Sequence, residues 1–364
     1  MYIFLISLLA VIVAVYLFMG GPQFGKAPSS KRLQAMQQSP NYRDGVFHNL
    51  SLTPSLTEGA TTSSVMKGFF FGDKKRRKPP AVLPSQKANL HNIDAGSNVL
   101  VWFGHSSYFM QVDGRKILVD PVFSGNASPI MGSNKSFAGS DVYGVDDMPG
   151  IDYLIISHDH WDHLDYPTIK KMRPKVKKVI TTLGVGAHLE RWGYDGAIIM
   201  EGDWGSELAL DAGFKVNVTP ARHFSGRAFK RNGTLWASFV LTTPGMKIYI
   251  GGDSGYDTHF AETGVKFGPF DLAILEDGQY NKSWKYIHML PEEVVQAAID
   301  LKAKMLLPVH WGKFALSLHD WDEPIRRVVK EAARREVPVL HPMIGQVLDI
   351  RNPAEQQAWW EGVK

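Results

Sequence analysis

Short apolar runs separated by turn residues recur along the chain from Ser97 onward. Two of these runs flank Asp113-Gly114, a dipeptide typical of a tight hairpin turn. The expected strands are 99–103, 108–112, 116–119, 151–156, 176–181, 196–200, 214–219, 235–242, 246–251, 271–275, 305–309 and 338–340. Helical patterns fall between the later strands, most clearly over 291–302 and 323–335. Hairpins followed by strand–helix alternation predict a layered α/β fold of two mixed sheets covered by helices.

The chain begins with an apolar run, Tyr2 to Met19, that contains no charged residue. Such a run is just long enough to cross a bilayer core of roughly 30 Å. A cleaved signal peptide is the alternative, but it would have basic residues before a shorter apolar run. We therefore expect a single-pass membrane anchor over residues 1–21. Basic residues flank only its carboxyl side, at Lys26, Lys31, Arg32 and Arg43, which favours a cytoplasmic body and leaves an external or periplasmic one open.

Residues 22–90 are rich in Ser, Thr, Pro and Gly and have weak apolar periodicity, as expected of a linker. Three phenylalanines at 69–71 precede a basic run at 74–78. This cluster suits either an anionic lipid surface or a solvated linker with a few buried aromatic rings. The predicted organisation is an anchor over 1–21, an extension over 22–90 and one large domain over 91–364.

Composition narrows the chemistry of this 364-residue chain. It has no cysteine, which excludes disulfides, a cysteine nucleophile and cysteine-ligated metal sites. The net charge of +4 is unevenly distributed, because residues 1–90 carry 11 basic and 3 acidic side chains while the remainder carries 29 and 33. The body is therefore slightly acidic, and we expect no nucleic-acid partner.

Chemistry concentrates in one motif, His158-x-His160-x-Asp162-His163, directly after the expected strand 151–156. Three imidazoles and a carboxylate within six residues are hard to explain by packing, because protonated imidazoles would repel one another and a bound cation removes that repulsion. In a loop after a strand, His158 and His160 can point to one side and Asp162 and His163 to a neighbouring point. This arrangement suits two metal ions a few ångströms apart.

Further ligands must come from downstream, because one loop cannot fill two coordination spheres. His223, Asp253 and His310 each follow an expected strand, and strand ends at one edge are where α/β proteins assemble sites. An aspartate suits a bridging position because it offers two oxygens and a negative charge. His105 and His288 are also of interest. We assign no role to His48, His91, His188, His259, His319 and His341.

These residues resemble the ligand pattern of the metallo-β-lactamase superfamily of binuclear metallohydrolases, over about Val99 to Met343. Five further strings narrow the resemblance to the branch that contains N-acylphosphatidylethanolamine phospholipase D and its bacterial relatives. They are Trp102–Ser106, Leu118–Ser124, Gly251–Tyr256, Phe267–Leu272 and His310–Leu316. The resemblance implies a four-layer αβ/βα sandwich.

The resemblance also implies roles for individual residues. Asp253 would bridge two zinc ions, one held by His158, His160 and His223 and the other by Asp162, His163 and His310. Iron or manganese would also suit this ligand set. Asp120 would orient the ligand loop and His105 would lie near the metals. Asp253, Asp162 and His288 are expected to act in catalysis, with Trp284 and Phe314 lining the substrate groove.

We expect a membrane-anchored, metal-dependent phosphodiesterase of phospholipase D type that acts on N-acylphosphatidylethanolamine-like lipids. Two cations that share a water lower its pKa toward neutrality, and the hydroxide that bridges them could attack phosphorus. The alternative is a lactone, thioester or amide hydrolase of the same fold, because fold does not select chemistry. A metal-binding scaffold is disfavoured by the complete ligand set, and a nuclease is disfavoured by the acidic body. The sequence does not predict an oligomeric state.

Overall fold

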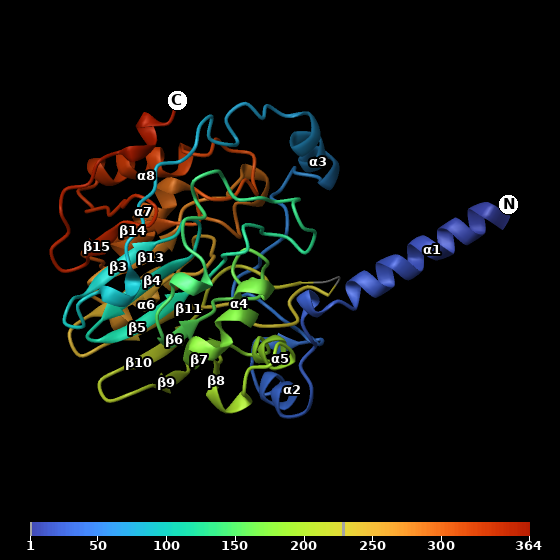
Figure 1. Cartoon of the computed structure of the whole chain (residues 1–364), viewed down its shortest axis with the longest axis horizontal. Coiled ribbons are helices and arrows are strands. Elements are labelled where there is room, and N and C mark those ends of the chain that lie inside the picture. Colours follow the sequence, from blue (N-terminus) through green and yellow to red (C-terminus); the bar gives the residue numbers. More distant parts are fainter. Residues whose placement is uncertain (1, 228–229) are drawn as a thin grey trace.

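The computed structural model describes residues 2–227 and 230–364, and two β-sheets form its centre (Figure 1). The first sheet has seven strands in the order β15-β3-β4-β5-β6-β7-β8. Their bounds are Val99–Trp102 for β3, Tyr108–Val112 for β4, Arg115–Val119 for β5, Ile151–Ile155 for β6, Val176–Thr182 for β7, Ile199–Gly202 for β8 and Val347–Asp349 for β15. Strands β15 to β5 pair antiparallel, whereas β5 to β8 pair in parallel, so the sheet is mixed.

The second sheet has six strands in the order β14-β13-β12-β11-β10-β9. Their bounds are Glu207–Ala209 for β9, Lys215–Thr219 for β10, Ser238–Thr242 for β11, Lys247–Ile250 for β12, Leu272–Glu276 for β13 and Leu306–Val309 for β14. This sheet is mixed as well, since β12, β13 and β14 pair in parallel and the others antiparallel.

Three apolar clusters hold the two sheets and the flanking helices together as layers. The largest lies between the sheets and joins residues such as Trp102, Ile155 and Phe239. A second packs the outer face of the first sheet against α4 (Tyr166–Met172) and α5 (Gly186–Arg191). The third packs the second sheet against the three helices α6 (His259–Phe267), α7 (Pro291–Asp300) and α8 (Glu323–Arg334). The result is the predicted helix–sheet–sheet–helix sandwich.

Some expected strands differ from the observed ones. The expected strand at 338–340 is wrong: only Val339 forms an isolated bridge, to Leu306. Pro338 and Pro342 have no N–H, so a longer ladder cannot form around it. The expected strand at 235–242 begins only at Ser238. Strands β9 and β15 were not expected, because three residues are too few for an alternating pattern to stand out.

The N-terminal region contains more structure than a linker pattern suggests. Helix α1 (Tyr2–Met19) has no buried residue and projects from the body (Figure 1), and among the described residues it is the one helix long and apolar enough to cross a membrane. Helix α2 (Ser30–Gln37), the β1–β2 hairpin (Tyr42–Arg43, Val46–Phe47) and α3 (Thr62–Phe71) follow. In α3, Phe69 stacks on Trp284, while Phe70 and Phe71 are exposed.

One carboxylate links the two sheets. Asp211 lies in the β9–β10 turn and accepts hydrogen bonds from Tyr153 of β6, Lys178 of β7 and Arg115 of β5. These hydrogen bonds, that of Tyr153 foremost, lower the pKa of the Asp211 carboxyl to about 2.

We expect Asp211→Asn to lower the free energy of unfolding by about 1 kcal/mol at pH 7, because Asp211 and its charged partners Arg115 and Lys178 are partly exposed and solvent screens the charge. The lowered pKa means that this stabilisation is complete above about pH 4, the unfolded value, and is lost as the pH falls through 2. Denaturant titrations of both proteins from pH 7 to pH 2 test this. The two curves should converge at the acid end, and a difference that stays constant with pH would contradict the assignment.

Candidate metal centre

The candidate site lies where strands of both sheets end. The loop after β6 carries His158 to His163, and the segments after β5, β10, β12 and β14 carry Asp120, His223, Asp253 and His310. His105 lies in the turn between β3 and β4. Each strand is fixed by its ladder and by buried apolar side chains, so the strand ends hold these polar groups in place.

A first group of donors joins His158, His160, His223 and Asp253, whose ligand atoms all lie within 4.8 Å of one another. His158 Nε2 and His160 Nδ1 are 2.8 Å apart, and His223 Nε2 lies 3.2 Å from the same His160 atom. Asp253 Oδ2 is 3.8 Å from His158 Nε2 and 3.7 Å from His223 Nε2. Four ligand atoms of this type at this spacing suit a single transition-metal ion.

A second group joins His105, Asp162, His163 and His310, again within 4.8 Å. His105 Nε2 lies 2.9 Å from Asp162 Oδ2, and His163 Nε2 lies 3.8 Å from the same oxygen. Asp253 also reaches this group, because its Oδ2 is 3.1 Å from His163 Nε2. One carboxylate therefore faces both groups, which is the arrangement that a bridging ligand requires.

Neighbouring groups set the orientation of the candidate ligands. His163 Nδ1 donates to Asp120 Oδ2 at 2.8 Å, so its Nε2 points toward Asp253. Asp120 also accepts from the backbone N–H of Ser157, which begins the histidine loop. His223 Nδ1 donates to the Ile287 carbonyl at 2.8 Å, which leaves Nε2 as an acceptor inside the first group. Metal-binding imidazoles are commonly fixed in this way.

The residues present fit metal ions. His163 Nε2 and Asp253 Oδ1 are buried yet have no hydrogen-bond partner, a costly state that ligation would relieve. Burial and the neighbouring imidazoles hold the pKa of His158 and His310 well below the usual histidine value, so both keep a free lone pair.

His163 behaves oppositely. Burial opposes its protonation, but the carboxylates of Asp253, Asp162 and Asp120 raise its pKa well above the usual value. Surroundings that attract a proton to this nitrogen would equally attract a cation.

Backbone conformation at the site is unusual. His105, Asp120 and His310 all have positive φ angles, of 53°, 40° and 71°. Such angles are uncommon for residues with a Cβ and concentrate at functional sites. Gly252, directly before Asp253, has φ 58°, and a Cβ there would lie 2.9 Å from the Ala237 carbonyl oxygen. A glycine is therefore needed to bring Asp253 into the site.

His288 approaches from the second sheet's side of the site. Its ring lies 5.0 Å from that of His223 and 5.3 Å from that of His310. Its Nδ1 lies 3.2 Å from Oε2 of Glu276, a buried carboxylate at the end of β13. Although burial opposes it, the Glu276 charge raises the pKa of His288.

The two residues expected to line the substrate groove, Phe314 and Trp284, differ in burial and in the groups that they contact. Phe314 is buried and meets the His105 ring edge-on, with ring centroids 5.2 Å apart. Trp284 is partly exposed and stacks on Phe69 of α3, with its Nε1 bonded to the Gln279 carbonyl. Phe314 therefore supports a candidate ligand, and Trp284 lies where the N-terminal extension meets the body.

Four contacting residues were not singled out from the sequence. Glu276 holds His288, Ser106 Oγ lies 2.8 Å from His310 Nδ1, and Arg227 and His188 contact the histidine loop. Glu276 directly follows the predicted strand 271–275, which was a usable signal. Ser106 lies in the string Trp102–Ser106 but was given no role of its own, and the assignment of no role to His188 is wrong, since its Nε2 contacts Asp159. No local pattern marks Arg227, because its role arises from pairing across the fold.

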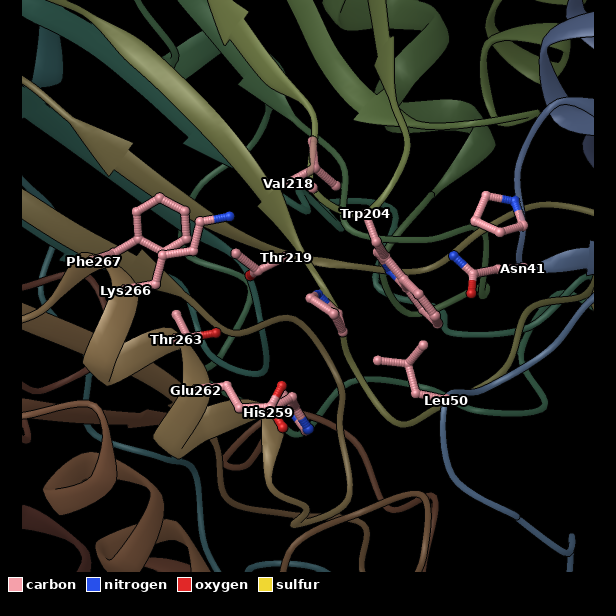
Figure 2. Close-up of a pocket in the computed structure, with 13 residues that line it drawn as sticks. Asn41, Leu50, Trp204, Val218, Thr219, His259, Glu262, Thr263, Lys266 and Phe267 are labelled. Carbon is pink, nitrogen blue, oxygen red and sulfur yellow. The ribbon is translucent and has the colours of Figure 1, made fainter.

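A separate cavity of about 350 Å³ opens between α6 and the N-terminal extension (Figure 2). Trp204, Leu50, His259, Thr219 and Phe267 are among the side chains around it. None of the candidate metal ligands lines it within the described part of the chain, so this cavity is distinct from the candidate metal centre.

The chain resembles proteins of known family. A family profile described as "Beta-lactamase superfamily domain" matches residues 115–311. An uncharacterized protein of Mycobacterium tuberculosis is 38% identical over 338 residues, which cover 89% of this chain and 88% of that protein. The N-acyl-phosphatidylethanolamine-hydrolyzing phospholipase D 1 of Caenorhabditis elegans is 30% identical over 283 residues, covering 68% and 77%. The solved structure of Igni18, a metallo hydrolase from Ignicoccus hospitalis, matches with a TM-score of 0.55 at 21% identity, covering 69% and 97%.

The matched region begins at β5 and ends just after His310, so it contains the whole histidine loop and the strand ends that face it. The sandwich of two mixed sheets and the clustered histidines and aspartates agree with this match. The chain therefore belongs to the beta-lactamase superfamily, and it is a metal-dependent hydrolase of the metallo-β-lactamase fold.

Proposed function

We propose that the protein is a binuclear, zinc-dependent phosphodiesterase of phospholipase D type that hydrolyses N-acylphosphatidylethanolamine-like membrane lipids. The observation that carries the binuclear site is the position of Asp253, whose Oδ2 faces His158 and His223 on one side and His163 on the other. His158, His160 and His223 would hold one ion, and Asp162, His163 and His310 the other. His105 offers a further donor to the second ion.

Two cations bound there would supply Lewis acidity at the phosphoryl oxygens and a water of lowered pKa. In the reaction, oxygen from water forms a bond to phosphorus while the bond from phosphorus to the ethanolamine oxygen breaks. The leaving oxygen then takes up a proton. His288 lies beside both donor groups and Glu276 supports its protonated form, so His288 would donate that proton.

Three features support a lipid substrate. The nematode relative hydrolyses N-acylphosphatidylethanolamine by its name. Helix α1, without buried residues, would anchor residues 1–21 in the membrane. The extension over 22–90 brings the Phe69 ring of α3 against Trp284 of the domain over 91–364. The basic residues after α1 favour a cytoplasmic body, with an external or periplasmic one as the alternative.

The test is lipid turnover by the full-length chain in detergent micelles with zinc. N-acylphosphatidylethanolamine should yield phosphatidic acid and an N-acylethanolamine, and mass spectrometry detects both products. His163→Asn, prepared identically, controls for contaminating lipases. If the protein holds two zinc ions per chain yet releases neither product, while lactones, thioesters or amides are opened, the phosphodiesterase proposal is wrong and the alternative hydrolase holds.

A further inference from the structure

The seven residues after α1, Gly20 to Lys26, are hereafter the exit segment. The segment lies against α5 and the histidine loop, and Figure 1 shows α1 leaving the body on the side that carries α5. Arg191 of α5 donates to the carbonyls of Gly20 and Gly25, and Trp192 Nε1 donates to Pro22 O at 2.7 Å. Docking therefore begins one residue after the helix ends.

Arg227 joins the exit segment to the histidine loop directly. Its Nε and Nη2 donate to the Gln23 carbonyl at 3.0 and 2.9 Å. Its Nη1 donates to the Asp159 carbonyl at 2.8 Å and to the Leu164 carbonyl at 2.6 Å. These two residues lie at the two ends of the loop. The side chain is 4% exposed, so solvent cannot take the place of these partners. A single guanidinium thus closes the loop and fastens the exit segment to it.

A second connection runs through His188. The backbone N–H of Lys26 donates to His188 Nδ1 at 2.9 Å, so the ring proton must reside on Nε2. That nitrogen lies 3.3 Å from Asp159 Oδ2, to which it donates. Asp159 separates His158 from His160, and its other oxygen accepts from the Gly226 N–H at 2.7 Å. The exit segment therefore determines the tautomer of the histidine that holds Asp159.

Aromatic packing covers the same junction. Phe24 meets Trp161, also in the loop, edge-on at 5.3 Å, and Phe18 at the end of α1 meets Phe24 at 5.2 Å. The Arg227 guanidinium makes a cation–π contact with Trp161, 3.9 Å from the ring centroid. Three independent contacts thus bind the exit segment to Asp159, Trp161 and the ends of the loop.

We propose that the exit segment is part of the metal centre's support: its docking, through the positioning residues Arg227 and His188, holds the loop that presents His158, His160 and His163. The proposal rests on the assignment of these histidines as ligands under the proposed function. Removing an outer support of a metal site typically weakens metal binding about 10- to 100-fold. Undocking the exit segment should have an effect of that size although it touches no candidate ligand.

Gly25→Ala is the sharpest test. Gly25 has φ 72°, and a Cβ there would lie 2.0 Å from His188 Nδ1, so alanine must displace the segment. Gly59→Ala is the matched control, because Gly59 has φ 82° and nothing within 4 Å of its added Cβ. Both full-length variants are compared with wild type by zinc competition with a chromophoric chelator, by the absorption spectrum of the cobalt-loaded protein and by amide hydrogen exchange without metal.

Gly25→Ala should weaken zinc binding roughly 10- to 100-fold, change the cobalt spectrum and speed exchange over 158–164, with Gly59→Ala matching wild type. Faster exchange confined to residues 20–26, with zinc affinity within about twofold of wild type, would overturn the proposal and make the segment a mere tether. If Gly25→Ala loses its cooperative unfolding transition, Arg191→Ala removes two docking bonds from outside the loop and is judged by the same results.

The same experiments separate this inference from the proposed function. A wild-type chain that binds no zinc would refute the ligand assignment, whereas loop exchange in the metal-free variants would still decide whether the exit segment supports the loop. A wild-type chain that binds two zinc ions but turns over no lipid would refute only the substrate.

Discussion

Replacing His163 by asparagine is expected to lower kcat/KM roughly 10³-fold or more and to reduce bound zinc from two ions per chain to about one. Both ring nitrogens of His163 face carboxylates: Nδ1 donates to Asp120 at 2.8 Å and Nε2 lies 3.1 Å from Asp253. An asparagine amide can still donate to Asp120, so the loop keeps its support, but it is too short to reach Asp253. The change therefore removes one candidate metal ligand and leaves the fold intact.

Metal analysis by mass spectrometry, lipid turnover and a thermal unfolding curve together test this prediction. His91→Asn provides the matched control, because it makes the same chemical change away from the site. His91 is exposed on a short helical turn. Wild-type activity and two zinc ions in His163→Asn would refute the second half of the proposed site. An equal loss in both variants would point to general damage from the substitution.

Replacing Phe239 by alanine is expected to lower the free energy of unfolding by about 3–5 kcal/mol. Phe239 is completely buried between the sheets, and in β11 it pairs with Val218 on one side and Ile250 on the other. Because strands on both sides fix its surroundings, they cannot close over the space left by the ring. The loss therefore includes both the apolar transfer term and a cavity term.

Denaturant titration in one detergent measures this change. Phe71→Ala is the control, since Phe71 is 84% exposed at the end of α3 and its removal should shift stability by no more than about 0.5 kcal/mol. Similar shifts in both variants would mean that the inter-sheet core does not dominate stability.

Much of this architecture was visible in the sequence because its signals are local. The histidine loop lies within six residues, and Asp120, Asp253 and His310 each follow an apolar run that the structure places in β5, β12 and β14. The layer order follows from hairpins that give way to strand–helix alternation, a pattern that residue spacing records directly.

What the sequence did not reveal depends on contacts between distant segments. His188 lies 162 positions from Lys26 and Arg227 lies 204 from Gln23, so no window of sequence contains either pair. A Ser-, Pro- and Gly-rich composition predicted a linker because it has little apolar periodicity, yet such a segment can dock through its backbone carbonyls. His105 was expected only near the metals, and its position in a donor group depends on a positive-φ turn between β3 and β4.

The docking of Gly20 directly after Met19 has a consequence for kinetics. If α1 spans a bilayer, the body has no slack chain on which to swing, and the site stays at one height and one tilt above the leaflet. Such an enzyme searches for lipid in two dimensions. Its rate should follow the mole fraction of substrate in the membrane, and should fall when inert lipid dilutes that surface at constant bulk concentration.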